Sequence, residues 1–297
     1  ITGGAGADII TGGNAIDTIS GGGAADNISG GAGNDIITGG AGNDIIAGGS
    51  GLDFLEGGLG NDTFNIDAAY DTITDLGGDS GTDSDIVVVA NIAILNATDI
   101  ISFTATSGTS NAGTATFNLK SGGTRTLDLS AATGSGSYIL KGDSGNDSIT
   151  GTAGADTISS GAGDDIITIG TAGHGNNDTV DGGGGADVLQ LSSGSHTFGT
   201  DNKLLAVETV KTHSSGSTVV LTGQTENLTI TGGAGADIIT GGNAIDTISG
   251  GGAADNISGG AGNDIITGGA GNDIIAGGSG SDTINVDEGT DTISDLA

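Results

Sequence analysis

The sequence predicts an all-β solenoid, in which flattened coils stack on one another. Each coil consists of short strands joined by glycine-rich turns. A nine-residue pattern occurs seven times without a gap between Gly3 and Asn65, and it reads Gly-Gly-x-Gly-x-Asp-x-U-x, where U is a large apolar residue. Glycine provides 64 of the 297 residues and proline provides none. Self-similarity at a short fixed period is typical of repeat architectures.

Each copy of the nonapeptide predicts one turn and one short strand. Six glycine-rich residues reverse the chain, since glycine adopts positive φ without a steric penalty, and the three that follow form strand. Two turns and two strands then close one coil of eighteen residues. A single coil cannot bury its apolar eighth-place residue, so coils have to stack at about 4.8 Å. The eighth places are Ile10, Ile19, Ile28, Ile37, Ile46, Leu55 and Phe64.

The sixth place of the nonapeptide is aspartate in every copy, and stacking puts every second aspartate into one column. One predicted column is Asp8, Asp26, Asp44 and Asp62, and the other is Asp17, Asp35 and Asp53. Neighbouring charges in a column repel by roughly 3 to 4 kcal/mol at an effective dielectric constant of about 20, before screening by solvent. No lysine or arginine precedes Lys120. The array is therefore expected to need a cation between its turns.

Calcium is the cation that these ligands favour. The turns offer carboxylate and carbonyl oxygens without sulfur or imidazole, and such hard donors select calcium over zinc or copper. The candidate carboxylate ligands are Asp8, Asp17, Asp26, Asp35, Asp44, Asp53, Asp62, Asp147, Asp156, Asp165, Asp187, Asp237, Asp246, Asp255, Asp264, Asp273 and Asp282. The candidate backbone ligands are carbonyl oxygens of turn residues such as Gly4, Gly6, Gly31, Gly33, Gly40, Gly42, Gly260, Gly262, Gly269 and Gly271.

The seven copies from Gly3 to Asn65 resemble the calcium-binding nonapeptide of the RTX (repeats-in-toxin) family. The resemblance implies a right-handed parallel β-roll or β-helix solenoid, with several Ca2+ ions held in its turns by the aspartates and by backbone carbonyls. It also implies export by type I secretion. Two copies depart from the family pattern, because Ala15 and Ala24 replace the fourth-place glycine.

Changes in the pattern divide the chain into five predicted parts. They are a first array with a closing segment (1–76), β-rich rungs or an insertion without the nonapeptide (77–141), a second array (142–190), β-solenoid rungs (191–229) and a third array (230–297). The closing segment adds Asp67, Asp71 and Asp75 as further candidate ligands. His174, in an extended copy within the second array, is interpreted as a solvent-facing spacer.

Region 77–141 is open to two interpretations, either broader solenoid rungs or a small β insertion. It contains strand-sized runs such as Ile86–Ala90 and Thr114–Leu119, separated by Gly, Ser, Asn and Thr. Asn91–Ala97 is a candidate helical turn.

A long segment of the chain is duplicated without change. Residues Ile1–Gly51 and Ile230–Gly280 are identical, and Asn285–Leu296 repeats the closing words of Asn65–Leu76. Identity over such a length indicates recent tandem duplication. The chain begins without methionine, and we interpret it as a piece of a long tandem array.

Composition excludes several classes of partner. The formal net charge of −32 argues against nucleic acid and against anionic membrane surfaces. The absence of cysteine excludes disulfides and leaves metal as the stabilising cross-link. We expect no transmembrane segment, since no apolar run is long enough, and we identify no signal peptide. Without calcium we expect disorder.

The sequence predicts a protein that is not an enzyme. It contains neither His-Glu-x-x-His nor Gly-x-Ser-x-Gly. The first hypothesis is a secreted, extracellular or cell-surface structural protein, the repeat unit of a bacterial surface layer (S-layer), filament or matrix polymer that self-associates into a lattice or filament. Two alternatives stay open: the stalk of a giant adhesin exported by type I secretion, and the calcium-dependent secretion and folding tail of an RTX hydrolase.

Overall fold

A computed structural model describes residues 1–67, 70–76, 84–170 and 178–295. It is an all-β structure with one short 3-10 helix, η1 (Asp201–Lys203), among the described residues, which confirms the predicted fold class. The chain forms two compact units, Ile1–Thr152 and Ala153–Ala297. In each unit the strands pair in parallel with strands of the next coil, so each unit is a β-solenoid.

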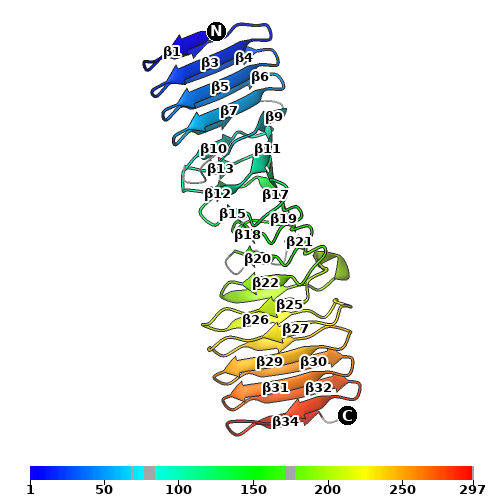
Figure 1. Cartoon of the computed structure of the whole chain (residues 1–297). Coiled ribbons are helices and arrows are strands. Elements are labelled where there is room, and N and C mark those ends of the chain that lie inside the picture. Colours follow the sequence, from blue (N-terminus) through cyan, green and yellow to red (C-terminus); the bar gives the residue numbers. More distant parts are fainter. Residues whose placement is uncertain (68–69, 77–83, 171–177, 296–297) are drawn as a thin grey trace. The chain divides into compact units, whose positions relative to one another are not determined.

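Three sheets make up the first unit (Figure 1). The first has the order β1 (Thr2–Gly4), β3 (Thr18–Gly23), β5 (Ile36–Ala41), β7 (Phe54–Leu59), β9 (Tyr70–Ile73), β11 (Ile94–Ile100), β14 (Thr114–Leu119) and β17 (Ser137–Lys141). The second has β2 (Ile9–Thr11), β4 (Asn27–Ala32), β6 (Ile45–Ser50), β8 (Thr63–Ile66), β10 (Ile86–Val89), β13 (Ser110–Asn111) and β16 (Thr133–Gly134). The third has β12 (Ser102–Thr104), β15 (Thr126–Asp128) and β18 (Ser148–Thr150).

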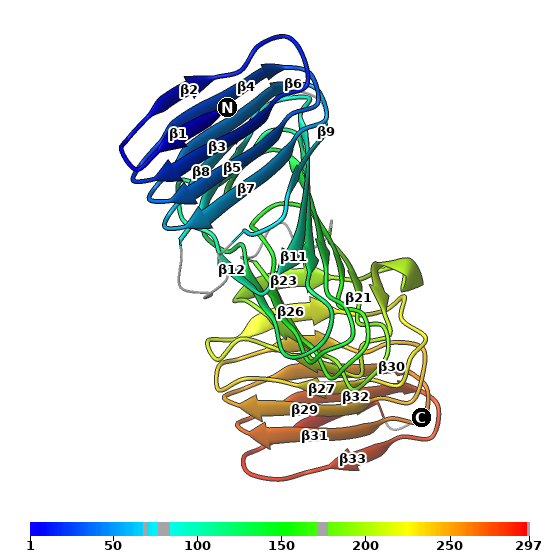
Figure 2. The same ribbon diagram turned by 45° about the horizontal axis from the view of Figure 1, so that its top comes forward.

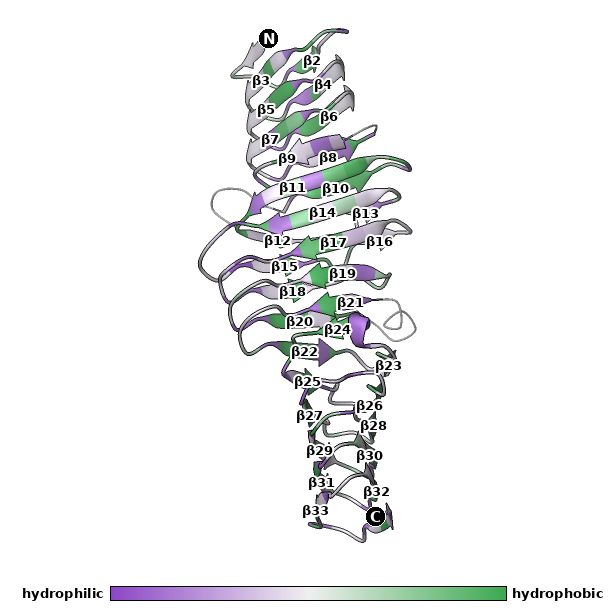
Figure 3. Cartoon of the chain, turned by 90° about the vertical axis from the view of Figure 1, so that its right-hand side faces the viewer, coloured by the Kyte–Doolittle hydropathy of each residue, from purple (hydrophilic) through white to green (hydrophobic). Residues whose placement is uncertain are grey.

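In the first array two sheets face each other (Figure 2), and the buried eighth-place side chains form two stacks between them. Ile19 pairs with Ile37 and Ile37 with Leu55 in one sheet, eighteen residues apart each time. The stacked side chains are almost completely buried, and Ile37 and Leu55 are 0% exposed. Figure 3 shows hydrophobic residues recurring on strand after strand. Burying one such side chain contributes about 1.5 to 3 kcal/mol, so the core grows only by stacking coils.

Beyond the first array the strands continue the parallel stack with a longer coil. β10 pairs with β8, and β11 pairs with both β9 and β14. Phe117 stacks on Phe103 at 5.8 Å and on Tyr138 at 6.2 Å between ring centroids, and these rings lie inside the coil. The helical turn predicted at Asn91–Ala97 is wrong, because the alternately buried residues from Ile94 onward form strand β11.

Three groups of strands also make up the second unit. One contains β19 (Asp156–Ser159), β21 (Thr179–Asp181) and β24 (Leu204–Leu205). The next has the order β20 (Ile166–Ile169), β22 (Val188–Leu191), β25 (Thr209–Lys211), β27 (Thr229–Thr231), β29 (Thr247–Gly252), β31 (Ile265–Ala270) and β33 (Thr283–Asn285). The last has β23 (Gly194–Thr197), β26 (Ser217–Val220), β28 (Ile238–Thr240), β30 (Asn256–Ala261), β32 (Ile274–Ser279) and β34 (Thr292–Asp295).

The duplicated sequences fold alike but differ in burial at their first coil. Asp237 and Asp246 are 1% and 0% exposed, whereas their identical counterparts Asp8 and Asp17 are partly exposed. Strands β25 and β26 pair with β27 and β28 and cover the first coil of the second copy. Among the described residues there is no helix with the length and hydrophobicity that a membrane crossing requires.

Candidate metal centres

The sixth-place aspartates form hydrogen-bonded columns along the edges of the stack. The backbone N–H of Asp26 donates to Oδ1 of Asp44 at 2.7 Å, and that of Asp35 donates to Oδ1 of Asp53 at 2.8 Å. The same bond, between residues eighteen apart, joins all members of the two columns expected from the period: Asp8, Asp26, Asp44 and Asp62, and Asp17, Asp35 and Asp53. One carboxylate oxygen of each step is therefore used to hold the register.

The other predicted aspartates occupy equivalent places. Asp147 accepts from the N–H of Arg125 at 3.0 Å, Asp156 donates to Asp178, and Asp165 donates to Asp187. In the third array one column is Asp237, Asp255 and Asp273, and the other is Asp246, Asp264 and Asp282. Asp282 is partly exposed, whereas the other five are buried. His174 lies outside the described residues.

The columns also contain five acidic residues outside the nonapeptide copies, of which the sequence analysis names only Asp71 as a candidate ligand. The N–H groups of Asp53, Asp62, Asp156, Asp187 and Asp273 donate to carboxylate oxygens of Asp71, Asp85, Asp178, Glu208 and Asp291, respectively. Each of the five is followed after one residue by a strand residue of the apolar stack, such as Val87 after Asp85. The signal in the sequence is an acid-x-apolar triplet, even where the glycine pair is absent.

The second carboxylate oxygen of many column members is buried without a partner. The ladder aspartates are largely inaccessible, and Asp35 and Asp44 are each 1% exposed. The buried Oδ2 atoms that accept no hydrogen bond belong to Asp26, Asp35, Asp44, Asp53, Asp62, Asp71, Asp187, Asp255, Asp264, Asp273 and Asp291. Leaving a buried charged acceptor unsatisfied costs about 1 to 3 kcal/mol or more, so these atoms require an electropositive partner.

Several of these oxygens lie close to a backbone carbonyl oxygen beside a first-place glycine, where a Cβ would clash with both oxygens. A Cβ built on Gly39 would lie under 3.0 Å from Oδ2 of Asp44 and 2.6 Å from the carbonyl oxygen of Gly57 in the next coil. Gly30 has the same relation to Asp35 and to the carbonyl of Gly48. The first-place glycine is therefore required where a carboxylate and a carbonyl oxygen meet.

The predicted backbone ligands point along the stack toward the next turn. The carbonyl oxygens of the second- and fourth-place glycines face the corresponding glycines eighteen residues later, as Gly40 faces Gly58 and Gly42 faces Gly60. The same rule holds for the carbonyl oxygens of Gly4, Gly31, Gly33, Gly260, Gly262 and Gly271. Eighteen residues after Gly6 and Gly269 the chain has Ala24 and Asp287 instead of glycine. Between successive turns the structure thus gathers carboxylate and carbonyl oxygens, the donor set that calcium prefers.

When no cation is near, burial and neighbouring like charges disfavour the ionised form of these carboxylates and raise their pKa. The pKa of Asp62, Asp71 and Asp178 is raised to about 7, mainly by burial and in part by neighbouring carboxylates. Burial is also the largest cause of the raised pKa of Asp187 and Asp255, to about 6. A divalent ion among these oxygens would replace the proton and keep the column ionised at neutral pH.

Comparison with known families points to the same turns. The model of the RTX calcium-binding nonapeptide repeat (four copies) matches residues 2–37, 29–64, 38–73, 134–170, 172–195, 231–266 and 258–293. These matches cover more than half of the sequence and include both duplicated arrays. No curated protein matches the chain.

Proposed function

Because the chain belongs to the family of RTX calcium-binding nonapeptide repeat proteins, we propose that it binds calcium between the turns of its solenoid and serves as a rigid structural repeat outside the cell. Calcium then offsets the charge of the aspartate columns. The chain has 37 acidic and five basic residues, so its own side chains cannot do this.

The buried Oδ2 atoms of the columns support this proposal more than any other observation. Oδ2 of Asp44 has no hydrogen-bond partner, and it faces the same space as the carbonyl oxygen of Gly57. Both atoms are hard donors, and calcium takes six to eight such oxygens in flexible geometry. Magnesium, which demands near-ideal octahedral geometry and dehydrates reluctantly, fits a groove of fixed backbone carbonyls less well.

Calcium binding of this kind makes folding depend on the calcium concentration of the compartment. A chain whose columns repel without the ion stays unfolded where calcium is scarce and folds where it is abundant. Extracellular calcium modules bind with dissociation constants of about 10⁻⁴ to 10⁻³ M, which matches a role outside the cell. We therefore propose a secreted protein exported by the type I route, as is typical of the family.

The duplication supports a repetitive assembly. An identical segment in two arrays of one chain suits a scaffold built from many equal units, such as a surface layer, an extracellular filament or a matrix polymer. We propose no catalytic role, since the sequence contains neither the Gly-x-Ser-x-Gly nucleophile motif nor the His-Glu-x-x-His metalloprotease motif. An adhesin stalk is the second candidate, because an array of stacked coils would also serve as a rigid spacer.

Electron microscopy of the purified chain tests the scaffold role. In millimolar calcium we expect ordered sheets or filaments, and in chelator or in magnesium alone we expect neither. Isolated rods in calcium would favour the stalk. Particles of no regular form, from a chain that binds calcium and folds, would contradict the scaffold while leaving calcium binding in place.

A further inference from the structure

The closing copy of the third array places an aspartate where earlier copies have glycine. In the two preceding copies the second-place residues are Gly269 and Gly278, with φ of 101° and 99°. In the closing copy, Val286-Asp287-Glu288-Gly289-Thr290-Asp291, Asp287 occupies this place. A carboxylate side chain thus stands at a place where the two preceding copies offer only backbone.

Asp287 completes a group of three carboxylates at the last step of its column. One carboxylate oxygen each from Asp273, Asp287 and Asp291 lies within 4.8 Å of the others. The N–H of Asp273 donates to Oδ1 of Asp291 at 3.1 Å, and the N–H of Gly269 donates to both oxygens of Asp287, at 3.1 and 3.0 Å. These bonds hold the three side chains together against their mutual repulsion.

Two oxygens of this group are buried and unpartnered. Asp273 is 1% exposed, and Oδ2 of Asp273 and Oδ2 of Asp291 accept no hydrogen bond. Asp287 itself is exposed, so the group is open to solvent on one side. A cation could enter from that side and meet oxygens that nothing else satisfies.

The first unit has three aspartates of the same spacing at the end of its own array, but there the three carboxylates do not all come within 4.8 Å of one another. Asp53, Asp67 and Asp71 have the same spacing in the sequence, and the N–H of Asp53 donates to Oδ1 of Asp71 at 3.2 Å. Oδ2 of Asp53 and of Asp71 are again buried without a partner. Burial is the largest cause of the raised pKa of Asp53, and the charge of Asp67 raises it further.

We propose that Asp273, Asp287 and Asp291 form a three-carboxylate cation site that binds calcium more tightly than the internal turns. This proposal rests on the proposed calcium binding and adds a second class of site to it. Internal steps of a column bring two carboxylates together, whereas the closing step of the third array brings three. Since affinity for calcium rises with the number of charged ligands, this closing site fills first and fixes the end of the array.

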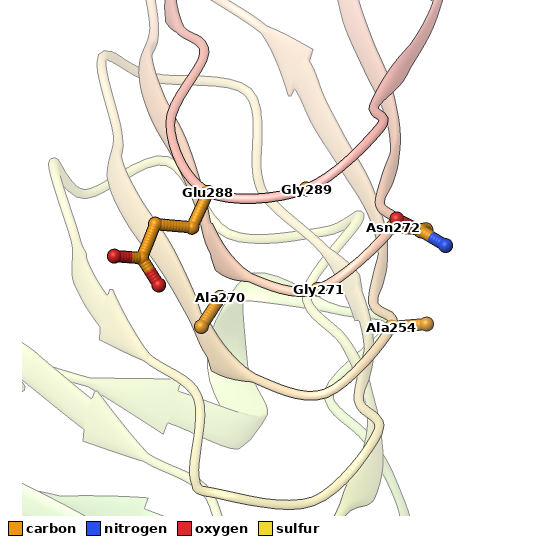
Figure 4. Close-up of a pocket in the computed structure, with 6 residues that line it drawn as sticks. All are labelled: Ala254, Ala270, Gly271, Asn272, Glu288 and Gly289. Atoms are coloured by element: carbon orange, nitrogen blue, oxygen red, sulfur yellow. The ribbon is translucent and has the colours of Figure 1, made fainter.

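The neighbouring Glu288 offers a matched control. It is exposed, it lies next to Asp287 in the same turn, and its side chain is directed away from the turn at Gly289 (Figure 4). Removing its charge tests general electrostatics without touching the three-carboxylate site.

Terbium luminescence excited through tyrosine can report on the closing step of either array. The chain has two tyrosines and no tryptophan, and Tyr70 directly precedes Asp71. Thr290 is the corresponding, exposed residue beside Asp291. The unchanged chain therefore reports on the step from Asp53 to Asp71, and the Tyr70→Phe/Thr290→Tyr chain reports on the three-carboxylate site. Terbium is titrated into each, in calcium just sufficient to keep the chain folded by circular dichroism.

We expect Asp287→Asn in the Tyr70→Phe/Thr290→Tyr chain to raise the terbium midpoint by roughly tenfold or more, since one of three charged ligands is lost. Glu288→Gln should leave the midpoint unchanged. Equal midpoints for Asp287→Asn and Glu288→Gln would overturn the three-carboxylate site while calcium-dependent folding still stands. A parent chain that neither folds in calcium nor binds terbium would overturn the proposed function as well.

Discussion

The backbone N–H of Asp26 donates a 2.7 Å hydrogen bond to Oδ1 of Asp44, its counterpart one coil later. The bond fixes the register of two coils and leaves Oδ2 of Asp44 buried and unpartnered. One carboxylate thus has two roles, because one oxygen holds the backbone and the other is available to an ion.

Substitutions of Asp35 should separate these two roles. Asp35→Asn keeps an oxygen for the N–H of Asp17 but removes the charge, so calcium binding weakens while the register stays. Asp35→Ala removes both and should lower the free energy of unfolding in saturating calcium by about 1.5 to 3 kcal/mol more than a surface change. Calcium titration and urea unfolding measure the two effects.

The control for Asp35 is Asp128→Asn, at a partly exposed residue outside the columns whose carboxylate accepts only the N–H of Ser130. Asp128→Asn should change the free energy of unfolding by less than about 0.5 kcal/mol. Equal calcium midpoints for Asp35→Asn and Asp128→Asn would contradict the role of the columns. Asp79, another aspartate outside the columns, lies beyond the described residues.

A methyl group at Gly39 should block the space between two turns. The Cβ of Gly39→Ala would meet Oδ2 of Asp44 and the carbonyl oxygen of Gly57, so we expect a higher calcium midpoint. Gly23→Ala is the matched control, because its Cβ meets nothing closer than 3.8 Å and other copies carry alanine at this place, as at Ala32. A shift of equal size in both variants would show that the effect is not local.

The apolar stack should depend on the inward residue of each strand and hardly on its neighbour. Ile37 is 0% exposed and Ile36 is 49% exposed, although they are adjacent in β5. Ile37→Ala should lower the free energy of unfolding by about 2 to 5 kcal/mol because it leaves a cavity. Ile36→Ala should lower it by less than about 1 kcal/mol. Urea unfolding in saturating calcium measures both, and the reverse order would contradict the register.

In chelator, acid should partly replace calcium. The pKa of Asp62 and Asp71 is about 7 in the folded state, above the ordinary value of 3.8. A raised folded-state pKa means that protons stabilise the fold, so this contribution is complete below the ordinary value and is lost as pH rises toward 7. Circular dichroism in chelator should therefore show more β-structure at about pH 5 than at about pH 8.

Calcium reverses the dependence on pH, because ions and protons compete for the same oxygens. The calcium midpoint should therefore rise as the pH falls from about 8 to about 6. A chelated chain with more β-structure at the higher pH, or a calcium midpoint independent of pH, would contradict this account of the columns.

The nonapeptide predicts the fold and most of the site, because its period is constant. Eighteen residues per coil place Asp26 under Asp44 and Ile19 against Ile37 without further information. The prediction ends where the period changes. The N–H of Asp62 donates to Oδ1 of Asp85, 23 residues later, a spacing that the eighteen-residue coil does not predict.

Glu208 and Asp287 show what else the pattern misses. Glu208 continues a column with a longer side chain, after a coil of 21 residues. Asp287 breaks the pattern by replacing a glycine, yet the turn folds its carboxylate back onto Gly269. Both positions depend on how neighbouring coils stack, which the spacing of one copy does not contain.

Crystals of the chain grown in calcium provide the most direct test of the central claim, through anomalous difference density between successive turns. We expect a peak beside Oδ2 of Asp44, near the carbonyl oxygen of Gly57, and corresponding peaks at the other buried steps of the columns. Intact coils with no density at these positions would contradict the claim that an ion between the turns holds the solenoid together.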